Sequence, residues 1–286
     1  MIEIPESLTL AEQLNETVKG KRILQAEAEH TKHSFAWYYG EPSAYAGIME
    51  GKRIGSSAGI GSMVEIELGG YRLLLGDGTN LRYFPPGKKL PERYQMRITL
   101  EDESSLICTV QMYGTMFLVR PESFDNPYYL AAKEKPLPGT EDFDYEYFSS
   151  LREGLSGKTS AKEFLATNQR IPGLGNGVLQ DILLEAGIHP RRKINTFGEE
   201  QWRRVYETVL RVLEQMHIAG GRNTEKTLFG EPGGYPTKLS KKTVGKPCPY
   251  CGSEIEKASY LGGTVYYCPF CQPLSCQPPV SGLTLC

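Results

Sequence analysis

The chain has 286 residues, of which 40% are hydrophobic and 23% charged, with a formal net charge of −2 and a pI near 6.2. At roughly 100–200 residues per domain, this length predicts two domains, and no apolar run reaches the roughly 18 residues that a membrane helix needs. The opening residues MIEIPESLTL carry acids where a secretion signal carries basic and apolar residues. We therefore expect a cytoplasmic protein with no membrane partner.

Charge is unevenly spread along the chain. Residues 1–150 carry 15 Lys and Arg against 22 Asp and Glu, a balance of −7, and residues 151–286 carry 17 against 12, a balance of +5. An acidic half joined to a basic half is typical of a chain of which only one part faces a polyanion. Random variation in surface charge explains these totals equally well.

The N-terminal half predicts one helix followed by a sheet. Leu10, Leu14 and Val18 share a helical face, and Gly20 ends the pattern. In residues 64–68 apolar side chains alternate with glutamates, Gly-Gly then turns the chain into YRLLL, and QMRITL, SLICTVQ and TMFLV are strand-like. Cys108 in the apolar SLICTVQ stretch is predicted to be a core residue, and the SFAWYYG segment suits either core packing or stacking on bases.

A helical block follows. Ser160-x-x-Glu163 and Thr196-x-x-Glu199 are capping-box signatures, the first opening a short helix and the second a longer one. Between them, the turn RIPGLGN at residues 170–176 leads into a helix that should stop at Gly187. Closely spaced glycines before a helix expose backbone N–H groups that suit a phosphate, and Asn176 can cap the helix or donate to that phosphate. Most turns of this kind are only connectors.

Six of the seven cysteines lie in the last 39 residues, and four of them form CPYC and CPFC with sixteen residues between the pairs. Because four thiolates leave no open position for chemistry, this spacing predicts one structural Zn²⁺. The predicted ligands are Cys248, Cys251, Cys268 and Cys271. Two disulfides are the alternative, which the odd cysteine count and the lack of a secretion signal disfavour. No role is predicted for Cys276 and Cys286.

Strand-like runs on either side of Gly262-Gly263 predict a β-hairpin between the two cysteine pairs. A hairpin of this size cannot bury a core of its own, so the metal supplies its folding energy. Lysines flank it, at positions 241, 242, 246 and 257. A zinc-bound β-hairpin flanked by lysines is suited to binding in a groove of a nucleic acid, although many zinc ribbons bind only protein.

The order of these parts resembles the formamidopyrimidine-DNA glycosylase and endonuclease VIII family. The PGLGN turn, AGIHPRRK, a GGR loop and the CxxC…YYCPFCQ finger carry the resemblance, together with Glu3, Pro5 and Glu6 before the first helix. The resemblance spans the chain to about Gln272. It implies an α+β fold: a two-layer β-sandwich with an N-terminal helix (1–130), a helix–two-turn–helix domain (131–235), and a zinc finger with a short tail (236–286).

The resemblance also implies a function. Members of the family excise oxidised or ring-opened bases from double-stranded DNA in base excision repair, and the partner here would be DNA with such a base or an abasic site. We expect a monomer, associated with the nucleoid when bound. In the family, the amine of an N-terminal proline forms a Schiff base at C1′ and the adjacent glutamate handles protons. Position 2 here is Ile2, which counts against AP lyase activity.

Other family positions match unevenly. Ser62 falls where the family has a phosphate-binding lysine, Asp77 near its void-filling methionine, and Gly263 at its finger-tip arginine. The site residues that the resemblance implies are, for catalysis, Met1, Ile2, Glu3 and Glu6, and, for DNA binding, Met112, Tyr113, Arg170, Gly173, Gly175, Asn176, Arg222, Lys242 and Gly263. Met112-Tyr113 takes the place of an Arg-Phe pair, and Arg222 lies in a loop that closes over the flipped base.

Two functions stay open at this point. One is a glycosylase, in which Glu3 acts on a water molecule or a free α-amine of Met1 or Ile2 forms the imine. The other is a non-catalytic lesion- or structure-specific DNA-binding protein on the same scaffold. Ile2 and Ser62 favour the second, and Glu3 and Glu6 favour the first. A protein-binding zinc ribbon without DNA does not explain the PGLGN turn.

Overall fold

The structure is a computed structural model that describes residues 1–274, so Cys276 and Cys286 lie outside the described residues. The chain forms two compact units. The first unit comprises residues 1–133 and 216–235, and the second comprises residues 134–215 and the chain from 236 onward. The sequence instead predicts 216–235 as part of the helical domain. Grouped by these units, the charge is −3 (16 Lys and Arg, 19 Asp and Glu) and +1 (16 against 15).

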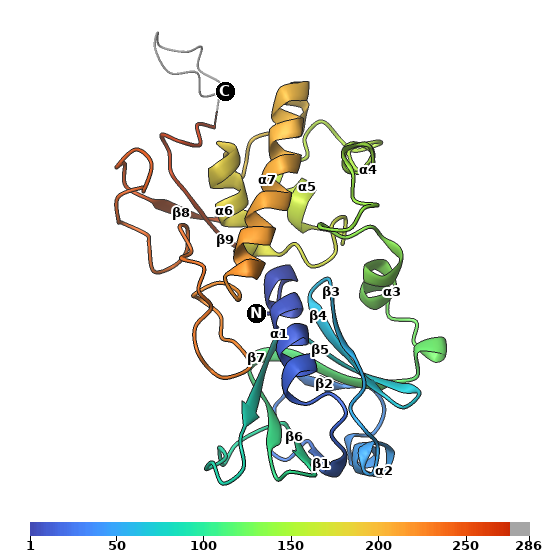
Figure 1. Ribbon diagram of the computed structural model, residues 1–286. Helices are drawn as coiled ribbons and strands as arrows, with labels where there is room; N and C mark the ends of the chain where they lie inside the picture. Colours follow the sequence, from blue (N-terminus) through green and yellow to red (C-terminus); the bar gives the residue numbers. More distant parts are fainter. Residues whose placement is uncertain (275–286) are drawn as a thin grey trace. The chain divides into compact units, whose positions relative to one another are not determined.

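The first unit is built on one mainly antiparallel sheet of seven strands (Figure 1). The order is β1-β6-β7-β5-β4-β3, and the short β2 pairs with β7 in parallel. Its strands are β1 (Ile23–Ala28), β2 (Ala36–Tyr38), β3 (Ser57–Ile60), β4 (Met63–Leu68), β5 (Tyr71–Phe84), β6 (Met96–Leu100) and β7 (Ser105–Val119). Two helices, α1 (Ile4–Thr17) and α2 (Tyr45–Met49), pack on it, and α3 (Pro127–Glu134) follows.

A large hydrophobic cluster collects side chains from α1 and from strands β1, β4, β5, β6 and β7. Leu14 and Val18 of α1 are fully buried in it, together with Leu73 from β5 and Leu100 from β6. The pairing of the long strands β5 and β7 shifts register between Asp77 and Thr79. Such a bulge bends a strand, so the two strands can curve around the cluster. The predicted sandwich is thus built from one hydrogen-bonded sheet. Cys108 is buried in the same core, as predicted, and burial raises the pKa of its thiol.

Helix α1 lies unusually close to β3. A Cβ atom at Gly59 would lie 2.7 Å from the backbone nitrogen of Leu8 and from the carbonyl carbon of Ser7. The hydroxyl of Ser7 donates to the carbonyl oxygen of Gly61 at 2.8 Å. The first two turns of α1 are therefore held against the β3–β4 turn by a contact that only glycine permits.

Most of the regular secondary structure in the second unit is helical. The helices are α4 (Tyr145–Ser150), α5 (Ala161–Ala166), α6 (Asn176–Ala186) and α7 (Glu199–Ile218), and the last turn of α7 belongs to the first unit. The capping box at Ser160 forms as predicted, with Ser160 accepting from the Glu163 N–H. The predicted box at Thr196 is wrong, because α7 begins only at Glu199 and the Thr196 hydroxyl donates to the Lys193 carbonyl. Most of the apolar side chains along α7, from Trp202 to Met216, are buried.

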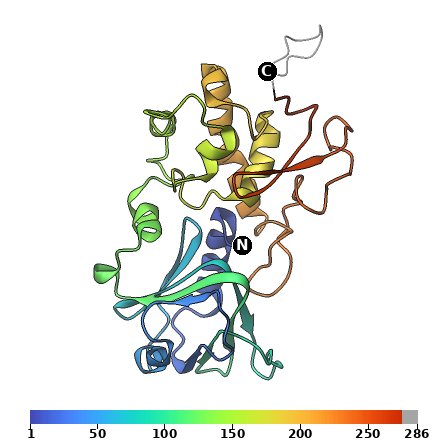
Figure 2. The same ribbon diagram turned by 180° about the vertical axis from the view of Figure 1, so that it is seen from behind.

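The hairpin β8 (Glu256–Tyr260) and β9 (Gly263–Tyr267) lies beside α6 in both views (Figures 1 and 2). Its turn falls one residue earlier than predicted, at Leu261 and Gly262. Both have positive φ, 48° and 70°, as a type I′ turn requires. The predicted α+β class, with an N-terminal helix, an antiparallel sheet and a hairpin finger, is confirmed. Within residues 1–274, no helix is long and apolar enough to cross a membrane.

We predict that Gly59→Ala destabilises the protein by about 1–3 kcal/mol, because the added methyl group overpacks the contact between α1 and β3. Urea unfolding followed by circular dichroism measures the change. Gly47→Ala is the matched control, since Gly47 lies in α2 and a Cβ there meets nothing within 4 Å. Equal stability of the Gly59 and Gly47 variants would contradict the proposed close contact.

Candidate active site and nucleic-acid interface

The first turn of α1 carries two buried carboxylates. Glu3 and Glu6 form a capping box, in which the Glu6 carboxylate accepts from the Glu3 backbone N–H at 3.2 Å, and Pro5 suits the first turn. Carboxylates at this end of a helix are stabilised by its dipole. The two residues are only 3% and 4% exposed. Buried carboxylates need a cationic partner, and one is supplied from a distant part of the chain.

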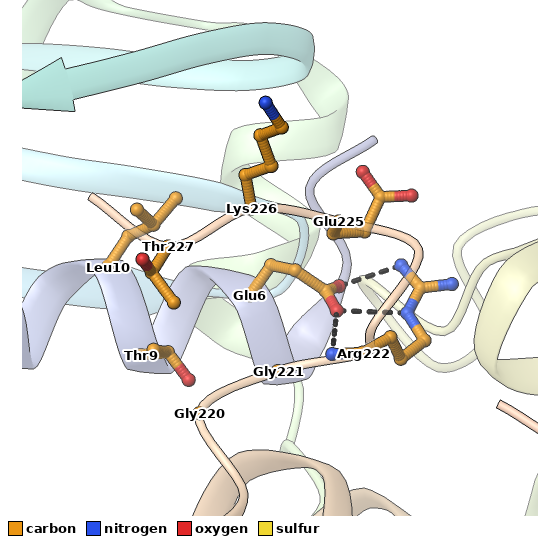
Figure 3. Close-up of a pocket in the computed structure, with 9 residues that line it drawn as sticks. All are labelled: Glu6, Thr9, Leu10, Gly220, Gly221, Arg222, Glu225, Lys226 and Thr227. Carbon is orange, nitrogen blue, oxygen red and sulfur yellow. Dashed lines mark hydrogen bonds and ion pairs between the residues drawn. The ribbon is translucent and has the colours of Figure 1, made fainter. Parts of the chain in front are cut away.

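That partner is Arg222, in the loop that follows α7. Its guanidinium bonds to both oxygens of Glu6, with Nε at 2.9 Å and Nη2 at 2.8 Å, and Nη1 lies 3.4 Å from a Glu3 oxygen. The Arg222 backbone N–H also donates to Glu6, at 3.2 Å. Figure 3 shows the guanidinium and the Glu6 carboxylate facing each other. Burial lowers the pKa of Arg222, but Glu3 and Glu6 outweigh it and the net pKa is raised.

Met1 and Ile2 lie beside this cluster. The α-amine of Met1 pairs with the Glu225 carboxylate, and the Met1 carbonyl accepts from Arg222 Nη2 at 3.3 Å. The Ile2 side chain is buried in the core, and its backbone N–H donates to the Asp77 carbonyl at 2.7 Å. The four residues assigned to catalysis from the sequence are therefore brought together.

A hollow of about 480 Å³ opens next to Met1. It is lined by Met1, Gly78, Asn80, Arg82, Thr109, Gln111, Met112, Tyr113, Thr224, Glu225 and Lys226. Met112 is 72% exposed, and the Tyr113 ring lies 5.9 Å from that of Trp37. Asp77 lies at the bulge with φ of 55°, and burial raises the pKa of its carboxyl group. A volume of this size accommodates a nucleobase.

In the second unit, the turn before α6 meets the hairpin. The N-cap of α6 is Gly175, so Asn176 does not cap the helix. Its Nδ2 donates instead to the Thr264 carbonyl at 2.9 Å, and its buried Oδ1 has no hydrogen-bond partner within the described residues. Gly173 takes a positive φ of 82°, as the turn requires. Arg170 donates to the carbonyls of Glu163 and Phe164, so its guanidinium caps the C-terminus of α5.

A lysine that the sequence reasoning did not select joins this cluster. Lys162 is 4% exposed, and its Nζ donates to the Tyr260 carbonyl at 2.7 Å. A Cβ atom at Gly263 would lie 3.4 Å from that Nζ and 3.8 Å from Asn176 Nδ2. Burial lowers the pKa of Lys162. No local sequence signal predicts this, because the approach of α5 to the hairpin is a tertiary contact. Lys242, by contrast, is an exposed residue.

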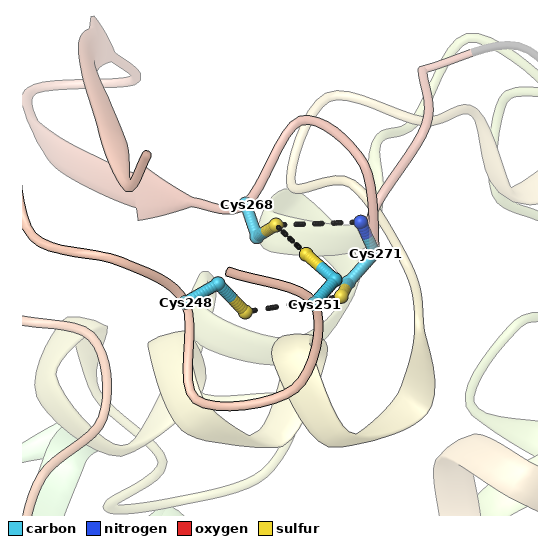
Figure 4. A group of neighbouring side chains, drawn as sticks. All are labelled: Cys248, Cys251, Cys268 and Cys271. Carbon is cyan, nitrogen blue, oxygen red and sulfur yellow. Dashed lines mark hydrogen bonds between the residues drawn. The ribbon is translucent and has the colours of Figure 1, made fainter. Parts of the chain in front are cut away.

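The four cysteines of the finger converge as separate thiols (Figure 4). Their sulfur atoms all lie within 4.8 Å of one another, an arrangement that can hold a metal ion. The sulfur atoms are 3.8 Å apart in Cys248–Cys271 and 3.4 Å apart in Cys251–Cys268. Gln272 braces the site, because its side chain accepts from the Cys268 N–H at 2.9 Å and donates to the Ile188 carbonyl.

His189 packs against the β8–β9 hairpin. It is 6% exposed, and its ring lies 4.5 Å from that of Tyr267. Its Nδ1 accepts from the Arg191 backbone N–H at 3.1 Å. Burial, followed by the charge of Arg191, lowers the pKa of His189 to about 4, so the ring is neutral near pH 7.

Comparisons with known proteins agree with this architecture. No family model matches the chain. The formamidopyrimidine-DNA glycosylase of Lactococcus lactis subsp. lactis (strain IL1403) is 27% identical over 278 residues, which cover 95% of this chain and 99% of that protein. The formamidopyrimidine-DNA glycosylase of Streptococcus pneumoniae serotype 4 (strain ATCC BAA-334 / TIGR4) is 31% identical over 198 residues, 67% of this chain and 71% of that protein.

Solved structures show the same fold. The Lactococcus lactis Fpg in complex with DNA containing an abasic site superposes with a TM-score of 0.80 at 23% identity, over 95% of this chain and 99% of that one. The MutM (Fpg) protein of Thermus thermophilus superposes with a TM-score of 0.78 at 25% identity, over 94% of this chain and 98% of that one. The similarity therefore extends through both units of the chain.

Proposed function

The chain belongs to the formamidopyrimidine-DNA glycosylase family, and from this premise we propose that it binds double-stranded DNA containing an oxidised or ring-opened base and hydrolyses the N-glycosidic bond of that base. The observation that carries the proposal is the pair of buried carboxylates, Glu3 and Glu6, which Arg222 links to Met1, a residue that lines the hollow of about 480 Å³. A nucleotide turned out of the duplex would enter this hollow.

The contacts of the two carboxylates support different roles. Glu6 accepts from the Glu3 N–H, the Arg222 N–H and two guanidinium nitrogens, so both of its oxygens are held as acceptors. Glu3 contacts the guanidinium at the longer distance of 3.4 Å. We assign proton transfer to Glu3 and anchoring to Glu6.

In the proposed reaction Glu3 acts as a general base on water. The water oxygen bonds to C1′ as the bond from C1′ to the base breaks, and the bonding electron pair leaves with the base. Glu3 takes the proton of the water and passes it to the departing base, which returns Glu3 to its carboxylate form. Tyr113, whose hydroxyl donates to the Met1 sulfur, borders the hollow where this takes place.

Strand cleavage depends on the amines at the N-terminus. A Schiff base needs a free amine, but the Ile2 nitrogen is a peptide nitrogen that donates to Asp77. Met1 lines the hollow, but its α-amine is paired with Glu225. We propose base release without efficient AP lyase activity.

The second candidate function is non-catalytic binding to a DNA lesion or to an altered DNA structure. The ion pair between Glu3 and Arg222 favours it, because a carboxylate held by a guanidinium is a weaker base. The two functions predict the same DNA-binding surface and differ only in base release.

For DNA binding, we propose that the N-terminus of α6 holds a backbone phosphate. The N-cap Gly175 and the exposed Lys242 support this site. Asn176 and Lys162 hold the turn against the hairpin through the carbonyls of Thr264 and Tyr260.

We propose that the metal is a single structural Zn²⁺. At a Zn–S distance of about 2.3 Å, a tetrahedral site places its sulfur atoms about 3.8 Å apart. The distances of 3.8 and 3.4 Å fit this geometry. When bound, the ion would fix the hairpin against α6 and supply no reactive ligand.

We predict that the protein releases the damaged base from an oxidised-base duplex and that Glu3→Gln lowers the single-turnover rate at least about 100-fold, the usual share of a general base. Binding to the same duplex should change little. Released base and strand breaks are measured separately, and the mass of the intact protein before and after borohydride reduction detects any imine.

Glu122→Gln is the control, because Glu122 forms only a 3.9 Å pair at an exposed site. No released base at excess protein would rule out the enzyme and leave the binding function.

We predict that Asn176→Ala and Lys242→Ala both weaken binding to lesion DNA, and that Lys242→Ala lowers the slope of log K against log salt by about one. Fluorescence anisotropy between 50 and 200 mM salt measures both quantities. Over this range, a protein with several phosphate contacts normally loses roughly ten-fold or more of its DNA affinity. Lys88→Ala, an exposed lysine of the first unit, serves as the control. Salt-independent binding would contradict a phosphate interface.

We predict one zinc ion per chain by elemental analysis. Removing it with a chelator should expose residues 236–274 to proteolysis and abolish DNA binding, because a small pinned hairpin depends on its metal for folding. Re-addition of Zn²⁺ should restore both, and Cys268→Ser should mimic the loss. Cys108→Ser is the control cysteine, since it lies in the core of the other unit. Full DNA binding by the metal-free protein would refute a structural role.

A further inference from the structure

Arg222 lies in the loop that the sequence assigns to DNA, but its charge is directed into the protein. The residue is 3% exposed, and its guanidinium contacts Glu3, Glu6 and the Met1 carbonyl. A phosphate of bound DNA would have to displace these contacts. The position of the group is thus that of an internal counter-ion.

Two carboxylates in one buried site cannot both stay ionised without a cation, because each disfavours the charge of the other. Arg222 meets this need with a paired contact to Glu6 and a single contact to Glu3. Since Glu6 fixes the plane of the guanidinium through two bonds, the remaining nitrogen is directed at Glu3.

We propose that Arg222 is a positioning residue, which keeps Glu3 ionised and oriented for the reaction at neutral pH and does not itself contact DNA. This inference rests on the proposed function, in which Glu3 accepts the proton of water. It goes beyond that function by giving the loop arginine, 216 positions away from Glu6, a defined part in the chemistry.

The loop has a second anchor that does not depend on Arg222. Leu228 is fully buried, its N–H donates to the Gln13 side chain at 2.8 Å, and its carbonyl accepts from the Tyr83 N–H at 2.8 Å. Neutralising Arg222 therefore changes the charge around the carboxylates while the loop keeps its attachment to α1 and β5.

The charged and titratable groups around Glu3 come from each element packed against it. Arg222 and Glu225 lie in the loop, Glu6 lies on the same helix, the α-amine of Met1 precedes it, and Tyr113 faces it from β7. Arg222 is the cation in direct contact with both carboxylates.

The first test is the pH dependence of single-turnover base release for Arg222→Gln and Arg222→Lys. The general base must be ionised, so the rate falls toward low pH. Arg222→Gln should move this acid limb up by at least about one pH unit, the usual effect of losing a neighbouring guanidinium. Arg222→Lys keeps the charge and should leave the limb near its wild-type position at a lower rate. Arg53→Gln, which removes an exposed arginine paired with Glu101, is the matched control.

An acid limb for Arg222→Gln that coincides with the wild type would overturn the inference. Weakened binding with an unchanged pH profile would do the same, since it would identify Arg222 as a DNA contact.

The second test does not need activity. Without Arg222, ionisation of the buried carboxylates opposes folding, so the loss of thermal stability should grow as pH rises. The Tm difference between wild type and Arg222→Gln is expected to be larger at pH 8 than at pH 5. The double variant Arg222→Gln/Glu6→Gln should recover part of that loss at pH 8, because it removes an uncompensated charge.

A pH-independent difference with additive single and double variants would refute the counter-ion role. If the wild type releases no base, the proposed function fails, and the stability measurements still decide whether Arg222 holds the carboxylates ionised.

Discussion

The contact between one guanidinium and two carboxylates is the constraint on which the site depends. Burying three charged groups is favourable only when each finds its partners, because an unpaired buried charge costs several kcal/mol, roughly 3–5 when one member is removed. Glu6 is satisfied by four donors, and Arg222 contacts Glu3, Glu6 and Met1. The cluster therefore exists only if α1 and the loop after α7 meet, which explains why residues 216–235 group with the N-terminal unit.

The sequence predicted well what depends on near neighbours in the chain. The capping box at Ser160 follows from residues three positions apart, and the four convergent cysteines follow from two C-x2-C pairs with sixteen residues between them. The sequence placed Glu3, Pro5 and Glu6 before the first helix, whereas α1 begins at Ile4 and contains the last two. The prediction failed where contacts between distant parts of the chain determine the local structure. Thr196 satisfies the spacing of a capping box, yet its hydroxyl bonds to Lys193 and the helix starts later. The net charges of the two sequence halves are −7 and +5, but those of the two structural units are −3 and +1. The difference arises because five acids at 134–146 belong to the second unit.

Lys162 shows why part of the candidate site lay beyond sequence reasoning. Its ammonium reaches the Tyr260 carbonyl across 98 positions of sequence, and it lies where a side chain at Gly263 would begin. The bare glycine and the buried lysine are therefore complementary. A larger residue at 263 would compete with Lys162 and Asn176 for the same space, so the finger tip, α5 and α6 have to be considered as one surface.

Backbone contacts also limit the chemistry available at the N-terminus. The Ile2 N–H donates to the Asp77 carbonyl, at a bulge where Asp77 has positive φ. A proline at position 2, preceded by Met1, would lack that N–H and leave the carbonyl without its donor. Met1 is in turn held by Glu225 and by Arg222, so removing it would open the carboxylate cluster as well as free an amine. Because Met1 is held in this way, the site favours activation of water by a carboxylate over attack on C1′ by an amine.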